Sequence, residues 1–175
     1  SQVSNSTLLH KITLSESSMA YAASGAVEGR IGWSTPSYFM SENDDYLRIL
    51  TTLWDSNTNQ DVHKLSVLKA KDDNLLEQVA QIPNANQPAA IGKPNESIFA
   101  VRFWGDRAYV VTFEQTDPLY VIDVSNPLTP NILGELEMPG FSTYLRPLND
   151  NYLFGLGRND GNDLDGNRLN GGVKV

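Results

Sequence analysis

A repeated pattern constrains the fold of this 175-residue chain more than any other feature. In one copy Arg102 precedes a Gly-Asp turn and a run that contains Tyr109, and in the other Arg146 precedes an Asn-Asp turn and Tyr152. The two arginines lie 44 positions apart, and residues 43–46 form a third copy of the turn that ends in tyrosine. A unit that recurs with its parts in the same order indicates a repeat architecture.

Short apolar and β-branched runs, each bounded by Asn, Asp, Gly, Pro or Ser, occupy most of the chain. No window of a dozen residues keeps apolar residues at the i, i+3, i+4 and i+7 positions of a helix behind a cap. We expect strands at 8–14, 20–26, 46–54, 62–69, 75–82, 97–104, 108–113, 119–124, 132–138, 143–148 and 152–156, with another beginning at 173. The chain is therefore predicted to be all-β.

Four antiparallel strands in a unit of roughly 40 to 50 residues are typical of a β-propeller blade. A β-sandwich also contains many short strands, but nothing in it requires an Arg–turn–Tyr pattern at one offset. The sequence then divides into two outer strands of a first blade (8–26), a second blade (31–82), a third blade (97–138) and the inner strands of a fourth (141–175). Because a ring needs about 4 to 8 blades to close, we expect a β-propeller fragment of about three four-stranded blades, an incomplete ring.

Residues 97–113, 116–127 and 133–145 resemble the secreted β-propeller-domain proteins of bacteria and archaea, which are distant relatives of WD40 repeats. The resemblance implies the propeller fold and export, hence a secreted, periplasmic or cell-surface location, and it carries no established activity. Members of that family are longer and bear an export signal. Residues 1–6 show no such signal, and residues 171–175 are typical of a strand that is only beginning, so we expect a piece of a larger protein rather than a flexible tail.

Composition excludes several classes of function. Acidic residues outnumber basic ones by 21 to 13, and the formal charge of −8 argues against nucleic acid and anionic membrane surfaces as partners. The absence of cysteine removes disulfides, thiolate zinc sites, iron–sulfur clusters and cysteine nucleophiles. His10 and His63 leave little material for a triad or a multi-histidine metal site, and no apolar run approaches the ~20 residues of a membrane-spanning helix. No catalytic residue is predicted.

Residues 159–172 form the most unusual stretch, since they are nearly all Asp, Asn and Gly. Calcium prefers six to eight oxygen ligands on a backbone that can wrap around it, and this composition supplies both. The order of an EF-hand is absent, because Gly161 stands where an acid is required and no Glu closes the loop. The alternatives are a calcium site and a long solvated connection between two strands of a blade. The candidate calcium ligands, the one cofactor considered, are Asp160, Asn162, Asp163, Asp165 and Asn167.

Arg102 and Arg146 are expected at matching positions of innermost strands, where they would face or flank the central channel. Two guanidinium groups there could bind an anion through paired hydrogen bonds. The alternative is that each arginine pairs with an acidic residue of a neighbouring blade.

Three functional hypotheses follow. The first is a non-catalytic binding scaffold of an exported propeller protein, in which loops such as 55–61 and 157–172 contact a protein or a small extracellular ligand. The second is the propeller domain of an enzyme, with its substrate anchored in the channel by Arg102 and Arg146. The third is a calcium-stabilised secreted module. Open blade edges also predict oligomers that complete the sheets.

Overall fold

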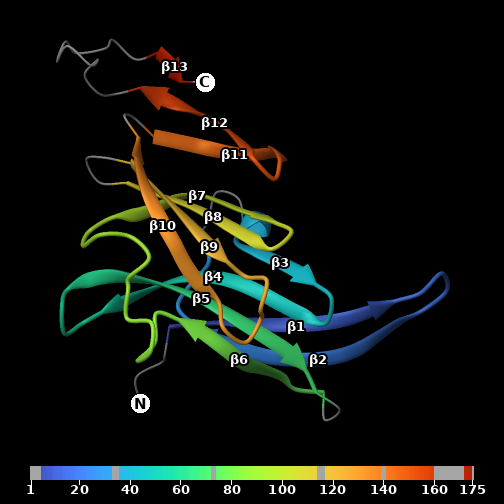
Figure 1. The fold of residues 1–175 in the computed structure, drawn as a ribbon. Helices are drawn as coiled ribbons and strands as arrows, with labels where there is room; N and C mark the ends of the chain where they lie inside the picture. Colours follow the sequence, from blue (N-terminus) through green and yellow to red (C-terminus); the bar gives the residue numbers. More distant parts are fainter. Residues whose placement is uncertain are drawn as a thin grey trace.

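Strands dominate the computed structural model, which describes residues 5–32, 36–71, 74–113, 117–138, 141–159 and 172–174. Within these ranges there is one short 3-10 helix, η1 (Pro36–Phe39), and the strands form four separate antiparallel sheets (Figure 1). The all-β prediction is confirmed.

The second and third sheets have four strands each, and every strand pairs with its neighbours in chain order. The second sheet consists of β3 (Met40–Asn43), β4 (Tyr46–Asp55), β5 (Gln60–Ala70) and β6 (Leu76–Ile82). The third sheet consists of β7 (Ser97–Trp104), β8 (Arg107–Phe113), β9 (Asp117–Asp123) and β10 (Asn131–Met138). This meander of four antiparallel strands is the arrangement of a propeller blade.

The first and fourth sheets have fewer strands. The first sheet is the hairpin of β1 (Ser6–Leu14) and β2 (Met19–Glu28). The fourth sheet contains β11 (Phe141–Asn149), β12 (Tyr152–Asn159) and the three-residue β13 (Gly172–Lys174). The four sheets stack on one another along the chain and, over the described residues, remain open rather than closing into a ring (Figure 1).

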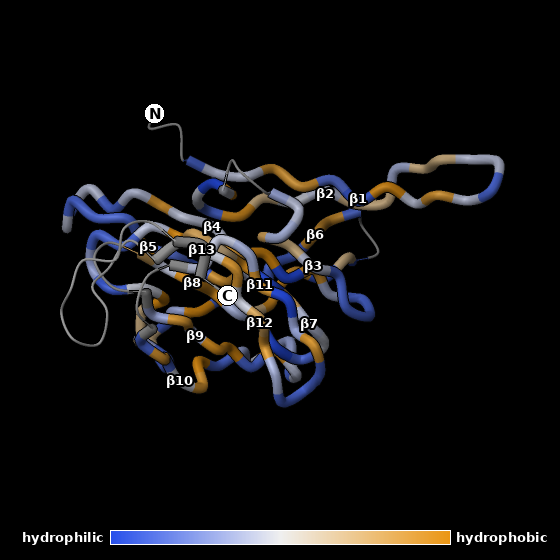
Figure 2. The backbone as a smooth tube through the Cα atoms, turned by 90° about the horizontal axis from the view of Figure 1, so that it is seen from above, coloured by the Kyte–Doolittle hydropathy of each residue, from blue (hydrophilic) through white to orange (hydrophobic). Residues whose placement is uncertain are grey.

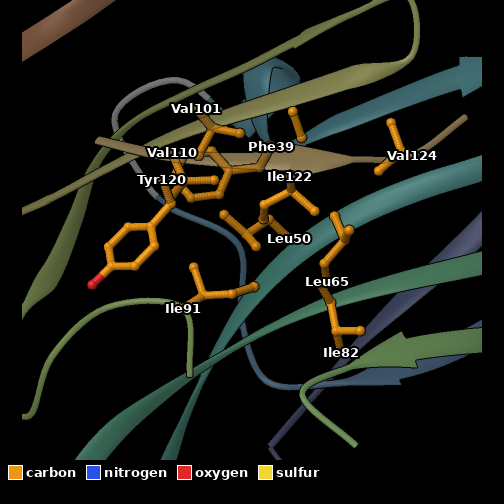
Figure 3. Close-up of a cluster of buried hydrophobic side chains, with 11 residues drawn as sticks. Phe39, Leu50, Leu65, Ile82, Ile91, Val101, Val110, Tyr120, Ile122 and Val124 are labelled. Carbon is orange, nitrogen blue, oxygen red and sulfur yellow. The ribbon is translucent and has the colours of Figure 1, made fainter. Parts of the chain in front are cut away.

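Successive side chains along the strands of the third sheet point to opposite faces, and apolar side chains on each face bury both faces of the sheet. Val101, Val110 and Tyr120 are cross-strand neighbours, and they pack toward the second sheet in the largest hydrophobic cluster (Figure 3). The residues beside them, Val111 and Leu119, pack on the opposite face with Leu145 of β11, in the fourth sheet. A slip of one residue in the strand pairing would move each side chain to the opposite face of the sheet. The hydrophobic clusters on the two faces therefore determine the register.

The second sheet is covered on both faces in the same way. Leu50 and its cross-strand partner Leu65 are fully buried toward the third sheet (Figure 3), whereas Ile49 and Leu68 are buried toward the first sheet.

Close backbone approach joins the first sheet to the second. A Cβ atom on Gly25 would lie 2.3 Å from the Leu76 carbonyl oxygen, so the strands can meet here only through glycine. Gly29 adopts the left-handed region (φ +89°), which glycine enters without strain, and the Thr51 hydroxyl donates to the Glu28 carbonyl oxygen over 2.7 Å.

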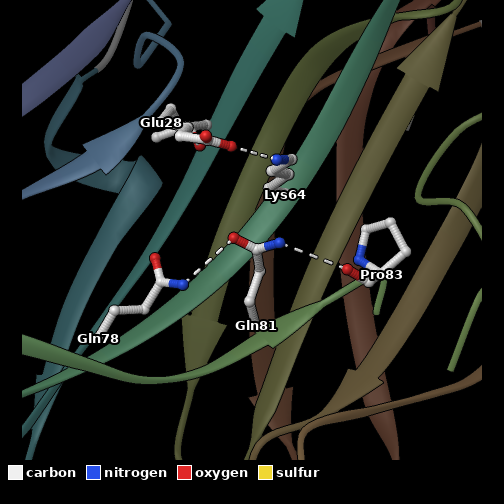
Figure 4. Close-up of polar contacts among 6 residues, drawn as sticks. Glu28, Lys64, Gln78, Gln81 and Pro83 are labelled. Carbon is white, nitrogen blue, oxygen red and sulfur yellow. Dashed lines mark hydrogen bonds and ion pairs between the residues drawn. The ribbon is translucent and has the colours of Figure 1, made fainter. Parts of the chain in front are cut away.

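Polar side chains form contacts both at this joint and at the end of β6 (Figure 4). Lys64 of β5 forms an ion pair with Glu28 of β2. Gln81 of β6 accepts a hydrogen bond from Gln78 over 3.3 Å and donates one to the Pro83 carbonyl oxygen over 3.5 Å. These contacts connect the end of β6 to the segment that leads toward the third sheet.

The pattern of apolar runs did not predict β3, nor the short helix η1 before it. β3 is only four residues long and its sequence, Met-Ser-Glu-Asn, is mostly polar. It is a strand because it pairs with β4 from Met40 opposite Ile49 to Asn43 opposite Tyr46, across the turn in which Asp44 has a positive φ of 51°. Tertiary pairing, not local propensity, determines this element.

Candidate binding cleft

A cleft of about 270 Å³ opens between the second and third sheets, at the end where β4 turns into β5. Its walls come from three separate parts of the chain: the segment after β2, strands β4 and β5, and the beginning of β7. Its polar lining includes Arg30, Thr52, Asp61 and Ser97, while Ile31 and Ile98 are among its apolar residues.

Backbone hydrogen bonds hold Arg30 at the rim of the cleft. The Arg30 and Thr52 amides donate to each other's carbonyl oxygens, both over 2.8 Å, so the arginine is fixed to β4 directly after Gly29. Its side chain is 50% exposed, and Nη2 lies 3.9 Å from Oδ2 of Asp61. A contact of this length at the surface contributes about 0–1 kcal/mol, so the guanidinium keeps most of its capacity to bind an acceptor.

Asp61 supplies an acceptor that the protein leaves unused. Its Oδ1 atom is buried and receives no hydrogen bond within the described structure. Leaving a buried acceptor without a donor costs about 1–3 kcal/mol, so turning this 23% exposed carboxylate toward a donor in the cleft would be favourable.

His63 lines the cleft, and both of its ring nitrogens are hydrogen-bonded within the protein. Nδ1 lies 2.9 Å from the Thr52 hydroxyl and Nε2 lies 2.8 Å from the Glu96 carbonyl oxygen. Since a carbonyl can only accept, Nε2 carries the proton and Nδ1 accepts from Thr52. Burial lowers the pKa of His63, which keeps the ring neutral in this tautomer. The histidine therefore positions the walls rather than acting on a ligand.

Glu96 fixes the segment between β6 and β7 against the cleft. Its buried carboxylate accepts from the Lys93 amide over 2.7 Å and from the Thr112 hydroxyl over 2.6 Å. Together with the bond from His63 to its carbonyl, Glu96 links the second sheet, the connection and the third sheet.

Arg102 and Arg146, the two arginines predicted for an anion site, lie on β7 and β11, neighbouring first strands that pack against each other (Figure 1). The Arg102 guanidinium carbon lies 5.1 Å from the centre of the Tyr38 ring, and Tyr38 in turn lies 6.5 Å from the Tyr144 ring. The Nε of Arg102 is buried without a hydrogen bond, and Arg146 is exposed. In the described part of the chain neither arginine forms an ion pair.

A buried arginine that the sequence did not single out is Arg48 on β4. It is 3% exposed, donates to the Gly105 carbonyl oxygen over 2.7 Å and to the Ser41 hydroxyl over 2.9 Å, and stacks on Phe103 at 5.3 Å. Burial lowers the pKa of Arg48, although Asp106 and Asp44 oppose the shift. It connects the β7–β8 turn to the second sheet. Its position two residues after Tyr46, at the repeated turn, was the available signal.

The candidate calcium ligands, Asp160, Asn162, Asp163, Asp165 and Asn167, lie outside the described residues. Where the structure does describe the chain, no group of three or more His, Asp or Glu side chains is placed to hold a metal ion. No helix in the described ranges has the length and apolarity needed to cross a bilayer.

Comparison with known proteins agrees with the sheet architecture. The model of a family described as "Beta propeller domain" matches residues 1–175. An uncharacterized protein of Methanocaldococcus jannaschii is 37% identical over 141 residues, which cover 81% of this chain and 21% of the relative. An uncharacterized protein of Archaeoglobus fulgidus is 38% identical over 157 residues, covering 88% of this chain and 22% of the relative. The chain thus spans about a fifth of the length of these curated relatives. By its sheets and by these matches, it belongs to the beta-propeller domain family.

Proposed function

We propose that this propeller segment is a non-catalytic binding module and that its ligand binds in the cleft between Arg30 and Asp61. The observation that carries the proposal is the buried Oδ1 of Asp61, an acceptor without a donor, in a cleft that also presents a half-exposed guanidinium. Both nitrogens of His63, the histidine in the cleft, are already hydrogen-bonded to the protein, which favours binding over acid–base chemistry.

The ligand best suited to the cleft is a peptide segment. Its N–H groups can donate to Asp61, its carbonyl or carboxylate oxygens can accept from Arg30, and its side chains can contact Ile31 and Ile98. Asp61 directly follows the 55–60 turn, so the cleft includes the end of the loop that the sequence predicted as a contact element. The resemblance to secreted propeller proteins supports an exported location for the module.

Titration of the isotope-labelled chain with trialanine, followed by NMR, tests the proposal. We expect saturable shifts of the Ser97 and Ile98 amides. Asp61→Ala and Arg30→Gln are each expected to weaken binding by about ten- to 150-fold, as the loss of one charged hydrogen bond of about 1.5–3 kcal/mol implies. Arg107→Gln is the matched control, because Arg107 pairs with Asp123 and does not line the cleft. Shifts confined to residues outside the cleft, or binding that neither variant weakens, would contradict the proposal.

A further inference from the structure

A second pocket lies at the junction between the second and third sheets, beside their last strands β6 and β10. Its volume of about 520 Å³ falls within the range of about 300–1,000 Å³ that is typical of small-molecule sites. Its walls are the end of β6 at Ile82, the connecting segment 86–89, and the start of β10 at Asn131 and Ile132. It shares no described lining residue with the cleft between Arg30 and Asp61.

The pocket belongs to the two complete four-stranded sheets. Ile82 of the second sheet is fully buried in the hydrophobic cluster between these sheets, and Ile132 of the third sheet packs against the same cluster. The β1–β2 hairpin lies on the opposite face of the second sheet and projects from the body of the molecule (Figure 2). The walls of the pocket therefore do not depend on the first or the fourth sheet.

Asn84 fixes the connecting segment to the end of β6. Its Nδ2 donates to the Gln81 carbonyl oxygen over 2.7 Å, and its Oδ1 accepts from the Asn86 and Gln87 amides over 2.8 Å and 3.0 Å. The Asn84 amide in turn donates to the Gln87 carbonyl oxygen over 2.9 Å. The backbone that carries Asn86 and Gln87 is thus held in place by the protein itself.

A turn of the same kind precedes the opposite wall. Oδ1 of Asn126 accepts from the Leu128 amide over 3.0 Å, and the Asn126 carbonyl oxygen accepts from the Thr129 amide over 3.1 Å. Strand β10 then begins at Asn131, opposite Asp123 of β9. Because both walls are fixed in advance, a ligand loses little binding energy to the ordering of the protein.

Gln87 carries an acceptor that the protein leaves unused. Its half-buried side chain lines the pocket, yet its Oε1 atom is buried and receives no hydrogen bond within the described structure. A buried acceptor without a donor is unfavourable, so turning this carboxamide toward a donor in the pocket would be favourable. The pocket therefore favours a ligand that donates a hydrogen bond.

The remaining lining residues indicate the class of ligand. Among the described residues that line the pocket none is ionisable, so a charged ligand would lose its water without meeting an opposite charge. The polar groups are the carboxamides of Asn86, Gln87 and Asn131, and Pro88 and Ile132 contribute apolar surface. Each carboxamide both donates and accepts, and a hydroxyl does the same through a single oxygen. A neutral ring that carries several hydroxyls, as in a monosaccharide, matches both parts of the lining.

We propose that this pocket is a carbohydrate site, in which a sugar hydroxyl donates to Oε1 of Gln87. Other hydroxyls bind the carboxamides of Asn86 and Asn131, and the C–H groups of the sugar ring contact Pro88 and Ile132. The site is additional to the peptide cleft, and neither site depends on the other.

Titration of the isotope-labelled chain with the methyl glycosides of glucose, galactose and mannose, followed by NMR, is the first test. We expect at least one of these sugars to cause saturable shifts of the Gln87 and Asn131 side-chain amide signals at millimolar concentration. None of these sugars causing a saturable shift at either residue overturns the proposal.

Replacement of the unused acceptor is the second test. Gln87→Met keeps a side chain of similar length and removes the acceptor, and the loss of one hydrogen bond is expected to weaken binding by about two- to tenfold, measured on the Asn131 signals. The fold should be retained, because the hydrogen bonds between Asn84 and Gln87 involve the Gln87 backbone. Gln78→Met is the matched control, since Gln78 is exposed on β6 and does not line the pocket. A Gln87→Met chain that binds as tightly as the control contradicts the proposal.

Trialanine distinguishes a carbohydrate site from a pocket that accepts any hydrogen-bonding molecule. We expect trialanine to leave the side-chain signals of Gln87 and Asn131 unchanged, and the sugars to leave the Ser97 and Ile98 amides of the cleft unchanged. Shifts of the Gln87 and Asn131 signals that are as large with trialanine as with the sugars would contradict the carbohydrate assignment.

Discussion

The second sheet and the β1–β2 hairpin are built from similar residues, yet their leucines lie in opposite environments. Leu50 in the second sheet is 0% exposed, whereas Leu14 in the hairpin is 70% exposed. The second sheet has a neighbouring sheet on each face, and the hairpin has a neighbour on one face only. The difference shows that burial in this architecture depends on how many sheets flank a strand, more than on the strand's own sequence.

Replacing one leucine from each region gives the largest expected contrast. Leu50→Ala is expected to lower the free energy of unfolding by about 2–5 kcal/mol, because it leaves a cavity between two sheets. Leu14→Ala, at a 70% exposed position, should change it by less than about 0.5 kcal/mol. Urea denaturation of the wild-type chain and the two variants measures both values. Equal costs for the two substitutions would mean that Leu14 is as well covered as Leu50.

Calcium would strengthen the fourth sheet if residues 160–167 bind it. At a calcium concentration one hundred times the dissociation constant, the native state gains about 2.7 kcal/mol. Thermal unfolding in calcium and in chelator measures the effect, and the double variant Asp163→Asn and Asp165→Asn should abolish it. Identical unfolding midpoints in calcium and in chelator would contradict calcium binding by these residues.

Glycine substitutions compare a position where two strands lie in close contact with one that faces open space. Gly25→Ala is expected to cost about 1–3 kcal/mol, because the new Cβ would overlap the Leu76 carbonyl where the hairpin meets β6. Gly134→Ala on β10 is the control, since no heavy atom lies within 4 Å of its added Cβ. The midpoint of urea unfolding reports both. A Gly25→Ala chain as stable as the control would show that the hairpin does not press against β6.

Substitutions of His63 and His10 test how the free energy of unfolding depends on pH. Burial lowers the folded-state pKa of His63 below its usual value, so only the unfolded chain takes up this proton as the pH begins to fall. The free energy of unfolding should therefore decrease below about pH 6.5, by up to about 1.4 kcal/mol per pH unit, until the folded-state pKa is reached. His63→Gln should remove this part of the slope, and His10→Gln, at an exposed position, should retain it. The same slope in both variants would assign the pH dependence to other groups.

The strands of the third sheet could be predicted from sequence because their signals are local. Ser97–Trp104 begins and ends as expected, and the cores alternate as the apolar pattern requires. The binding cleft could not be predicted in this way. Arg30, Asp61 and Ser97 belong to three segments that only the stacking of the sheets brings together. An acceptor without a donor, such as Oδ1 of Asp61, is a property of packing that no residue pattern reveals.

Hydrogen exchange along β1 and β5 tests most directly whether the number of flanking sheets determines how well a strand is protected. We predict that the amides of Gln60–Ala70, in a sheet that has a neighbour on each face, exchange more slowly than those of Ser6–Leu14, in the hairpin that has a neighbour on one face only. Equal protection along the two strands would contradict the account.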